Sequence, residues 1–168
     1  GFAMNRRLPT ARGYVIGPAP HGPVDHSVPV LRVADADGAL RAVLFGYACH
    51  NTTLSFYQFC GDYAGYAQQY LEEAHPGATA MFLTGCGGDQ NPYPRRTLEQ
   101  AQWHGRSLAS GVEAALEARP RPITGDLKLT LGETALPFAP PPTRDELLKR
   151  GESQDRYERR HAERLLEE

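Results

Sequence analysis

Residues 40–48 of the chain read LRAVLFGYA, and residues 49–53 that follow read CHNTT. The first stretch is a long apolar run, which predicts a β-strand buried on both faces. Residues 28–33 have the alternating pattern of a β-strand. A turn signal at Asp35–Gly38 separates them from the strand over residues 40–48, so we expect an antiparallel hairpin. The hairpin would bring His50 to the carboxyl end of a buried strand, where α/β folds bind ligands.

A second buried strand is predicted over residues 78–84 (ATAMFLT), and the glycine-rich loop Gly85–Pro94 follows it. If this strand lies parallel to the one before His50, their carboxyl ends meet at one edge of the sheet. We therefore expect the loop and His50 to lie side by side.

Two helices complete this part of the pattern. Asp62 is suited to cap a helix that runs to about Ala74, with apolar residues at helical spacing. Thr97 and Gln100 form a capping box for a second helix that ends near residue 118. Strands and helices in this order predict an α/β fold with a mixed sheet flanked by helices.

Other segments are less regular. Residues 5–27 contain many prolines and glycines and are expected to form loops. Alternating leucines predict a further strand over residues 125–136. Residues 139–168 read as a proline-rich linker and charged helices, with a capping box at Thr143 and Glu146. The ends of the chain show no start or stop signal, so we expect an incomplete fragment of a larger domain.

Composition excludes some functions. The formal net charge is −2, which argues against general nucleic-acid binding because that usually needs a strongly basic face. No apolar run approaches the ~18 residues of a membrane span. The three cysteines are an odd number without metal-ligand spacing, so they form no disulfide framework of their own.

The loop Gly85–Pro94 is the first candidate for chemistry. Its glycines permit positive φ and close approach of the backbone to a ligand, and their amides are suited to bind an oxyanion. It lacks the third glycine of a dinucleotide fingerprint and the Lys–Ser/Thr of a P-loop. A tight structural turn, with Asp89 accepting hydrogen bonds from local amides, is the alternative.

His50 is the second candidate. A neutral imidazole there is able to bind zinc or act as a base, although one ligand does not make a metal site. The alternative is a histidine that hydrogen-bonds to nearby backbone. Cys86 near a helix start is a candidate nucleophile with His50 as its base. A buried, unreactive thiol is the commoner case.

Several segments, in order along the chain, resemble the N-terminal domain of the neutral/alkaline non-lysosomal ceramidase family. They are Asn5–Arg7, Gly22–Asp25 continuing through Pro29–Val33, Tyr47–Thr52, Gly61–Ala67 and Gly87–Pro92. The resemblance covers roughly residues 5–95. It implies that residues 1–138 form part of the ceramidase-like α/β N-terminal domain.

The resemblance also implies roles for individual residues. His50 falls on a zinc-binding histidine, and Arg6 on an arginine near the active site. Gly88 and Asp89 fall on the Gly–Asp of a Gly–Asp–x–Ser–Pro–Asn motif, whose proposed catalytic serine is replaced here by Asn91. Asparagine cannot act as a nucleophile, although its amide is able to donate to an oxyanion. The sites that follow are Asp89 and Asn91 for catalysis, Arg6, Gly87 and Gly88 for substrate binding, and His50 for zinc.

The function implied is that of a zinc-dependent amidohydrolase that cleaves ceramide or a related lipid amide. The remaining zinc ligands would lie outside this chain, so we expect the remainder of its own chain as a partner and no activity from the chain alone. The family resemblance suggests a secreted or cell-surface protein. The rival hypotheses are a Cys86/His50 cysteine hydrolase and a non-catalytic lipid- or protein-binding member of the family.

Overall fold

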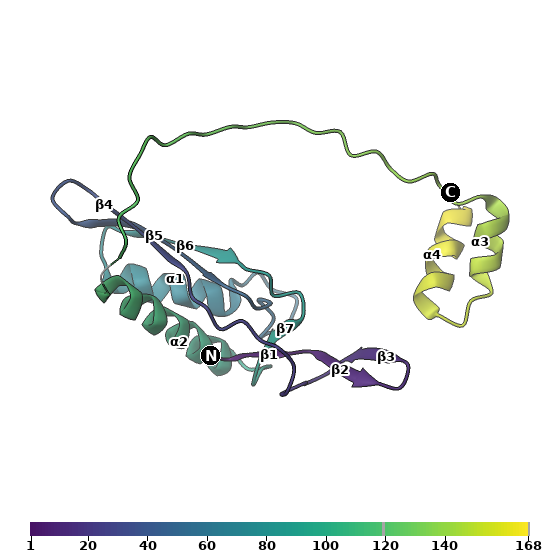
Figure 1. Ribbon diagram of the computed structural model, residues 1–168. Helices are drawn as coiled ribbons and strands as arrows, with labels where there is room; N and C mark the ends of the chain where they lie inside the picture. Colours follow the sequence, from purple (N-terminus) through teal and green to yellow (C-terminus); the bar gives the residue numbers. More distant parts are fainter. Residues whose placement is uncertain (119, 168) are drawn as a thin grey trace. The chain divides into compact units, whose positions relative to one another are not determined.

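The computed structural model describes residues 1–118 and 120–167 (Figure 1). The chain divides into two units, Gly1–Ile123 and Thr124–Glu168.

A three-stranded mixed sheet forms the centre of the first unit. It consists of β4 (Val30–Ala34), β5 (Leu40–Tyr47) and β6 (Thr79–Thr84), in that order across the sheet. β4 pairs antiparallel with β5, and β5 pairs parallel with β6. The predicted hairpin and the predicted mixed sheet are therefore confirmed, and the carboxyl ends of β5 and β6 lie at the same edge.

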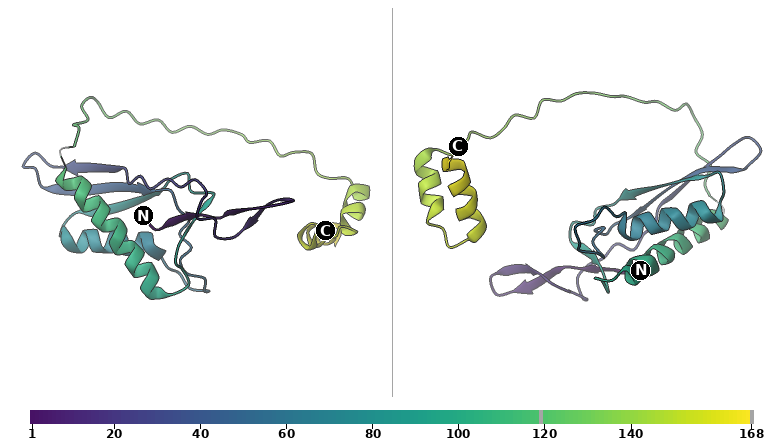
Figure 2. Two further views of the ribbon diagram at one scale, coloured as in Figure 1. Left: turned by 60° about the horizontal axis from the view of Figure 1, so that its bottom comes forward. Right: turned by 180° about the vertical axis from the view of Figure 1, so that it is seen from behind.

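The helices α1 (Asp62–Ala74) and α2 (Leu98–Glu117) cover one face of this sheet (Figures 1 and 2). Their backbones approach closely at Gly105, where an added Cβ would lie 2.8 Å from the carbonyl oxygen of Tyr63. The capping box that begins α2 is present as predicted.

The predicted cap of α1 is wrong. Gly61 occupies the N-cap position without a side-chain cap, and Asp62 is the first helical residue, with φ at 53°. Its carboxylate accepts a hydrogen bond from the backbone N–H of Leu54 at 2.9 Å. Asp62 therefore anchors the segment that leads away from His50 and does not close the helix end.

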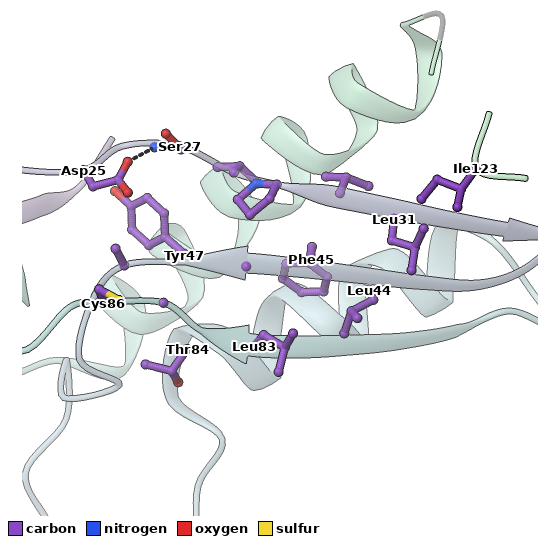
Figure 3. Close-up of a pocket in the computed structure, with 16 residues that line it drawn as sticks. Asp25, Ser27, Leu31, Leu44, Phe45, Tyr47, Leu83, Thr84, Cys86 and Ile123 are labelled. Carbon is purple, nitrogen blue, oxygen red and sulfur yellow. Dashed lines mark hydrogen bonds between the residues drawn. The ribbon is translucent and has the colours of Figure 1, made fainter. Parts of the chain in front are cut away.

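The two faces of the sheet differ in burial. Val43, Phe45 and Tyr47 of β5 point toward the helices and are buried. On the opposite face, side chains of all three strands are partly exposed and border a cavity of about 830 Å³ (Figure 3). Those drawn and labelled on this face include Leu31, Leu44 and Leu83. The prediction that β5 is buried on both faces holds for only one face of the described sheet.

Among the described residues, four short strands lie outside the central sheet. β1 (Ala3–Asn5) pairs antiparallel with β7 (Gln90–Pro92), and β2 (Arg7–Thr10) forms a hairpin with β3 (Gly13–Ile16). The expectation of loops over residues 5–27 and 85–94 was therefore wrong in these places. The hairpin turn depends on Gly13, whose φ of 116° favours glycine.

In the second unit, α3 (Arg144–Gly151) packs against α4 (Arg156–Glu167), and the predicted capping box at Thr143 is present. No strand forms over residues 125–136, so that prediction was wrong. Its leucines are almost fully exposed, because no described strand pairs with this segment. Across the described residues, none of the helices is both long and apolar enough to span a membrane.

Candidate functional site

The parallel pairing of β5 and β6 places His50 beside the loop Gly85–Pro94. Tyr47 at the end of β5 is in register with Thr84 at the end of β6. Beyond these residues the two segments stay together, because the backbone N–H of His50 donates to the carbonyl oxygen of Gln90 at 3.0 Å. The expected juxtaposition is confirmed.

The His50 ring is held by this loop through one nitrogen. Nδ1 lies 2.8 Å from the carbonyl oxygen of Gly87 and 3.0 Å from that of Gln90. Carbonyl oxygens only accept hydrogen bonds, so Nδ1 carries the proton in the neutral ring and Nε2 keeps a lone pair. The half-buried imidazole therefore hydrogen-bonds to backbone and is also oriented as a ligand or base through Nε2.

Of the two glycines expected to contact a ligand, only Gly87 is sterically required. An added Cβ at Gly87 would lie 2.4 Å from the backbone nitrogen of Cys49, whereas one at Gly88 would meet nothing within 4 Å. Neither residue has positive φ, so the left-handed conformation that glycine permits is not used at these two positions. The N–H of Gly87 donates to the carbonyl oxygen of Gly85 at 2.7 Å and is not free to bind an oxyanion.

Asp89 fastens the loop to the N-terminal strand. Its carboxylate accepts a hydrogen bond from Nδ2 of Asn5 at 2.9 Å, and the same amide donates to the carbonyl oxygen of Pro23 at 2.8 Å. Asn5 is buried. Asp89 does not contact the His50 ring, whose partners are the carbonyls of Gly87 and Gln90. The Asn5 amide therefore joins the Asp89 loop and the segment around Pro23 to the N-terminal strand.

Arg6, which directly follows β1, and Asn91 of β7 lie together. The backbone N–H of Arg6 donates to the carbonyl oxygen of Asp89 at 2.7 Å, and Nε donates to that of Gly88 at 3.2 Å. Nη1 of Arg6 lies 3.5 Å from Oδ1 of Asn91, whose side chain is buried. Both residues belong to the sequence motifs described above, and the structure brings them together.

Buried side chains pack against the segment that contains His50 and hydrogen-bond to its backbone. The hydroxyl of Tyr63 on α1 donates to the carbonyl oxygen of Cys49 at 2.7 Å. Burial raises the pKa of the Cys49 thiol to about 12. This cysteine is therefore a packing residue at neutral pH.

The structure gives no support to a Cys86/His50 pair. The thiol of Cys86 is exposed and lines the cavity on the open sheet face (Figure 3). Among the described residues, the hydrogen bonds of the His50 ring go to backbone carbonyls and none goes to Cys86.

Metal ligands do not gather around His50 within the described part of the chain. No group of three or more His, Cys, Asp or Glu side chains there is placed to hold a metal ion. His50 by itself is suited to supply one imidazole ligand to a metal through Nε2, because hydrogen bonds from Nδ1 fix the orientation of its ring.

Three positions of the candidate site were given no role of their own from the sequence alone. Gln90 supplies the carbonyl that holds His50, and its side-chain Oε1 accepts from the backbone N–H of Asp25 at 3.1 Å. Asn5 is the partner of Asp89. Arg95 lines a small cavity with Arg6 and Asn91. The sequence signal that was available for Gln90 was its place beside the glycines of a loop that follows a buried strand.

Comparisons with known proteins identify a related fold. No family model matches the sequence, and no curated protein matches it. Among solved structures, neutral ceramidase from Pseudomonas aeruginosa matches with a TM-score of 0.51 and 20% identity, over 70% of this chain and 21% of that chain. A ceramidase complexed with C2 matches with a TM-score of 0.52 and 20% identity, over 69% of this chain and 21% of that chain.

The chain thus spans about a fifth of the length of the ceramidase structures that it matches. The similarity in structure accords with the order of segments seen in the sequence. Most of this chain has the α/β fold of one part of neutral ceramidase.

Proposed function

We propose that this chain contributes the His50 part of a hydrolase site that cleaves the carbon–nitrogen bond of a lipid amide. The observation that carries the proposal is the geometry of His50, whose Nδ1 is fixed by the carbonyls of Gly87 and Gln90. The ceramidase fold supports the choice of reaction. The reaction adds water across the amide, so that the acyl carbon gains a hydroxyl group and the leaving nitrogen gains a proton.

Zinc is the proposed metal, and Nε2 of His50 is the atom that would bind it. Zinc held at such a site supplies Lewis-acid chemistry, because it polarises a carbonyl group and lowers the pKa of a water molecule to ~7. The other ligands are proposed to come from segments outside the described residues, since those residues offer no group of three.

Other residues of this chain have supporting roles in the proposal. Asp89 holds the loop in place through Asn5, and Gly87 lets the loop reach the backbone beside His50. Arg6 and Asn91 provide hydrogen-bond donors for oxygen atoms of the substrate. The family resemblance implies that Asn91 replaces a serine nucleophile, and the proposed metal chemistry does not require that nucleophile.

Zinc content and hydrolysis test the proposal together. Hydrolysis of a short-chain ceramide and of a simple amide is measured on this chain, with and without added zinc, and on a longer form of the protein that supplies further segments. We expect activity only from the longer form, and we expect His50→Ala to abolish its bound zinc and its turnover. Full zinc content in a folded His50→Ala variant would contradict the proposal that His50 binds the zinc ion.

Alkylation separates this proposal from a cysteine hydrolase. Activity that survives complete modification of Cys86 supports the metal site, and loss of activity supports the thiol. Cys86→Ala is the matched variant, because the exposed side chain contributes little packing. Absence of both zinc and turnover in the longer form would favour a non-catalytic binding protein.

A further inference from the structure

A small cavity of about 170 Å³ lies beside β7, separate from the open sheet face. Its apolar side includes Ile16 and Pro18. Its polar lining residues are Asn5, Arg6, Asn91, Tyr93 and Arg95. None of the residues that line it is acidic. Pockets for drug-sized ligands measure ~300–1,000 Å³, so this cavity is too small for a whole lipid. Its size suits the polar headgroup of a lipid.

Two arginines contribute positive charge to this cavity without an acidic partner. Within residues 1–118 and 120–167, neither Arg6 nor Arg95 forms an ion pair. Nη1 of Arg95 lies 3.5 Å from the carbonyl oxygen of Thr52, which leaves most of its donors unused. Burial, together with the positive charges of Arg96 and Arg6, lowers the pKa of Arg95. An anion bound between these guanidinium groups would relieve their repulsion.

Asn91 adds a neutral donor. A guanidinium group only donates hydrogen bonds, so the amide oxygen of Asn91 faces Arg6. Its Nδ2 is then the atom available to a ligand. Arg6, Asn91 and Arg95 thus present several N–H donors to one small space, and guanidinium groups match the planar geometry of a carboxylate.

Two residues that line the cavity are connected to the His50 segment. Gln90, whose carbonyl holds the His50 ring, directly precedes Asn91 in β7. Arg95 reaches the carbonyl of Thr52, which lies two residues after His50. A headgroup in the cavity would therefore be close to a bond that is hydrolysed beside His50.

We propose that this cavity binds the carboxylate of an N-acyl amino acid, so that the preferred substrate is an anionic lipid amide. This inference rests on the proposed function for the position of the amide, but the preference for negative charge follows from the cavity alone. The acyl chain would lie outside the cavity, which has room only for the headgroup.

Calorimetric binding measurements on this 168-residue chain test the inference without relying on catalysis. N-lauroylglycine is compared with N-lauroylethanolamine, which has the same chain length and no charge. We expect the glycine conjugate to bind about ten-fold more tightly or better, as charge-assisted hydrogen bonds confer. Inorganic phosphate, added as a competitor, should weaken binding of the glycine conjugate.

Variants identify the source of the preference. Arg95→Met should reduce the preference to near unity, and Arg95→Lys should retain part of it. Arg12→Met removes an exposed arginine from the hairpin turn and should leave the preference unchanged. Circular dichroism establishes that each variant is folded.

Equal binding of the two conjugates would overturn the inference, as would binding of neither or of phosphate alone. An unchanged preference in folded Arg95→Met would also overturn it. A charge preference without hydrolysis in the longer form would support the cavity assignment while contradicting the proposed function.

Discussion

Nδ1 of His50 lies 2.8 Å from the carbonyl oxygen of Gly87, which is 37 residues further along the chain. This hydrogen bond joins the ends of two parallel strands and fixes which ring nitrogen carries the proton. The approach is possible only because residue 87 has no side chain.

Gly87 and Gly88 should respond differently to the same substitution. Gly87→Ala would place a Cβ 2.4 Å from the backbone nitrogen of Cys49, so the loop must shift. We expect it to lower the free energy of unfolding by about 1–3 kcal/mol, as overpacking does. Gly88→Ala, which meets nothing within 4 Å, should change it by less than about 0.5 kcal/mol. Urea denaturation measures both, and equal effects would contradict the described contact.

Asn5 should depend on Asp89 for its stabilising effect. Asn5→Ala removes a buried amide that donates to Asp89 and to the carbonyl of Pro23, so we expect a loss of about 1–3 kcal/mol. In a double-mutant cycle with Asp89→Ala, the two losses should be less than additive. Asp37→Ala in an exposed turn, paired with Asn5→Ala, is the control and should be additive. Full additivity for Asn5 and Asp89 would mean that their bond contributes nothing.

The cysteines should differ in reactivity. Cys60 and Cys86 are exposed, whereas burial raises the pKa of Cys49 to about 12. At pH 8 the thiolate of Cys49 is therefore scarce, and alkylation should modify Cys60 and Cys86 first. Mass spectrometry of peptides after timed treatment follows each site. Rapid modification of Cys49 in folded protein would contradict its burial.

The same shift predicts how stability varies at high pH. The folded chain keeps the Cys49 proton up to about pH 12, whereas the unfolded chain loses it near the ordinary value of 9.0. Stability from this thiol is complete below pH 9 and is lost as the pH rises from 9 toward 12. Cys49→Ala should weaken this dependence. A pH profile of the unfolding free energy that matches the parent would contradict the assignment.

The open face of the sheet should make this chain associate. Leu83 is 58% exposed on that face beside other partly exposed apolar side chains. Such a face favours a partner, which we propose to be another segment of the same protein. Leu83→Glu should reduce self-association at little cost in stability, whereas Leu71→Ala in the core should cost about 2–5 kcal/mol. Sedimentation measures association, and a monomeric parent would contradict the prediction.

Much of the site was predictable because strand ends and capping boxes are local signals. The buried strand before His50 and the glycine loop after residue 84 were both recognisable, and parallel pairing then places them at one edge. The partner of Asp89 was not predictable, because Asn5 reaches it through a strand pairing between distant segments. The absence of positive φ in the loop was equally hidden, since glycine permits such angles without requiring them.

The wrong predictions of secondary structure have a common cause. Alternating leucines over residues 125–136 favour a strand, but a strand forms only where another strand offers hydrogen bonds, and no described strand does so here. Conversely, proline and glycine obscured the hairpin of β2 and β3, although Pro9 is tolerated there because the pair has exposed edges. Pairing partners, which sequence patterns do not reveal, decided both cases.

Long-range ¹H–¹⁵N correlation spectra of the histidine rings, recorded while zinc is added, test the central claim most directly. We predict that neutral His50 carries its proton on Nδ1 and that added zinc shifts the Nε2 resonance. His161, which lies on α4 in the second unit, is an internal control and should be unaffected at the same zinc concentration. A proton on Nε2 of His50, or a zinc response no larger than that of His161, would contradict the assignment of His50 as a zinc ligand.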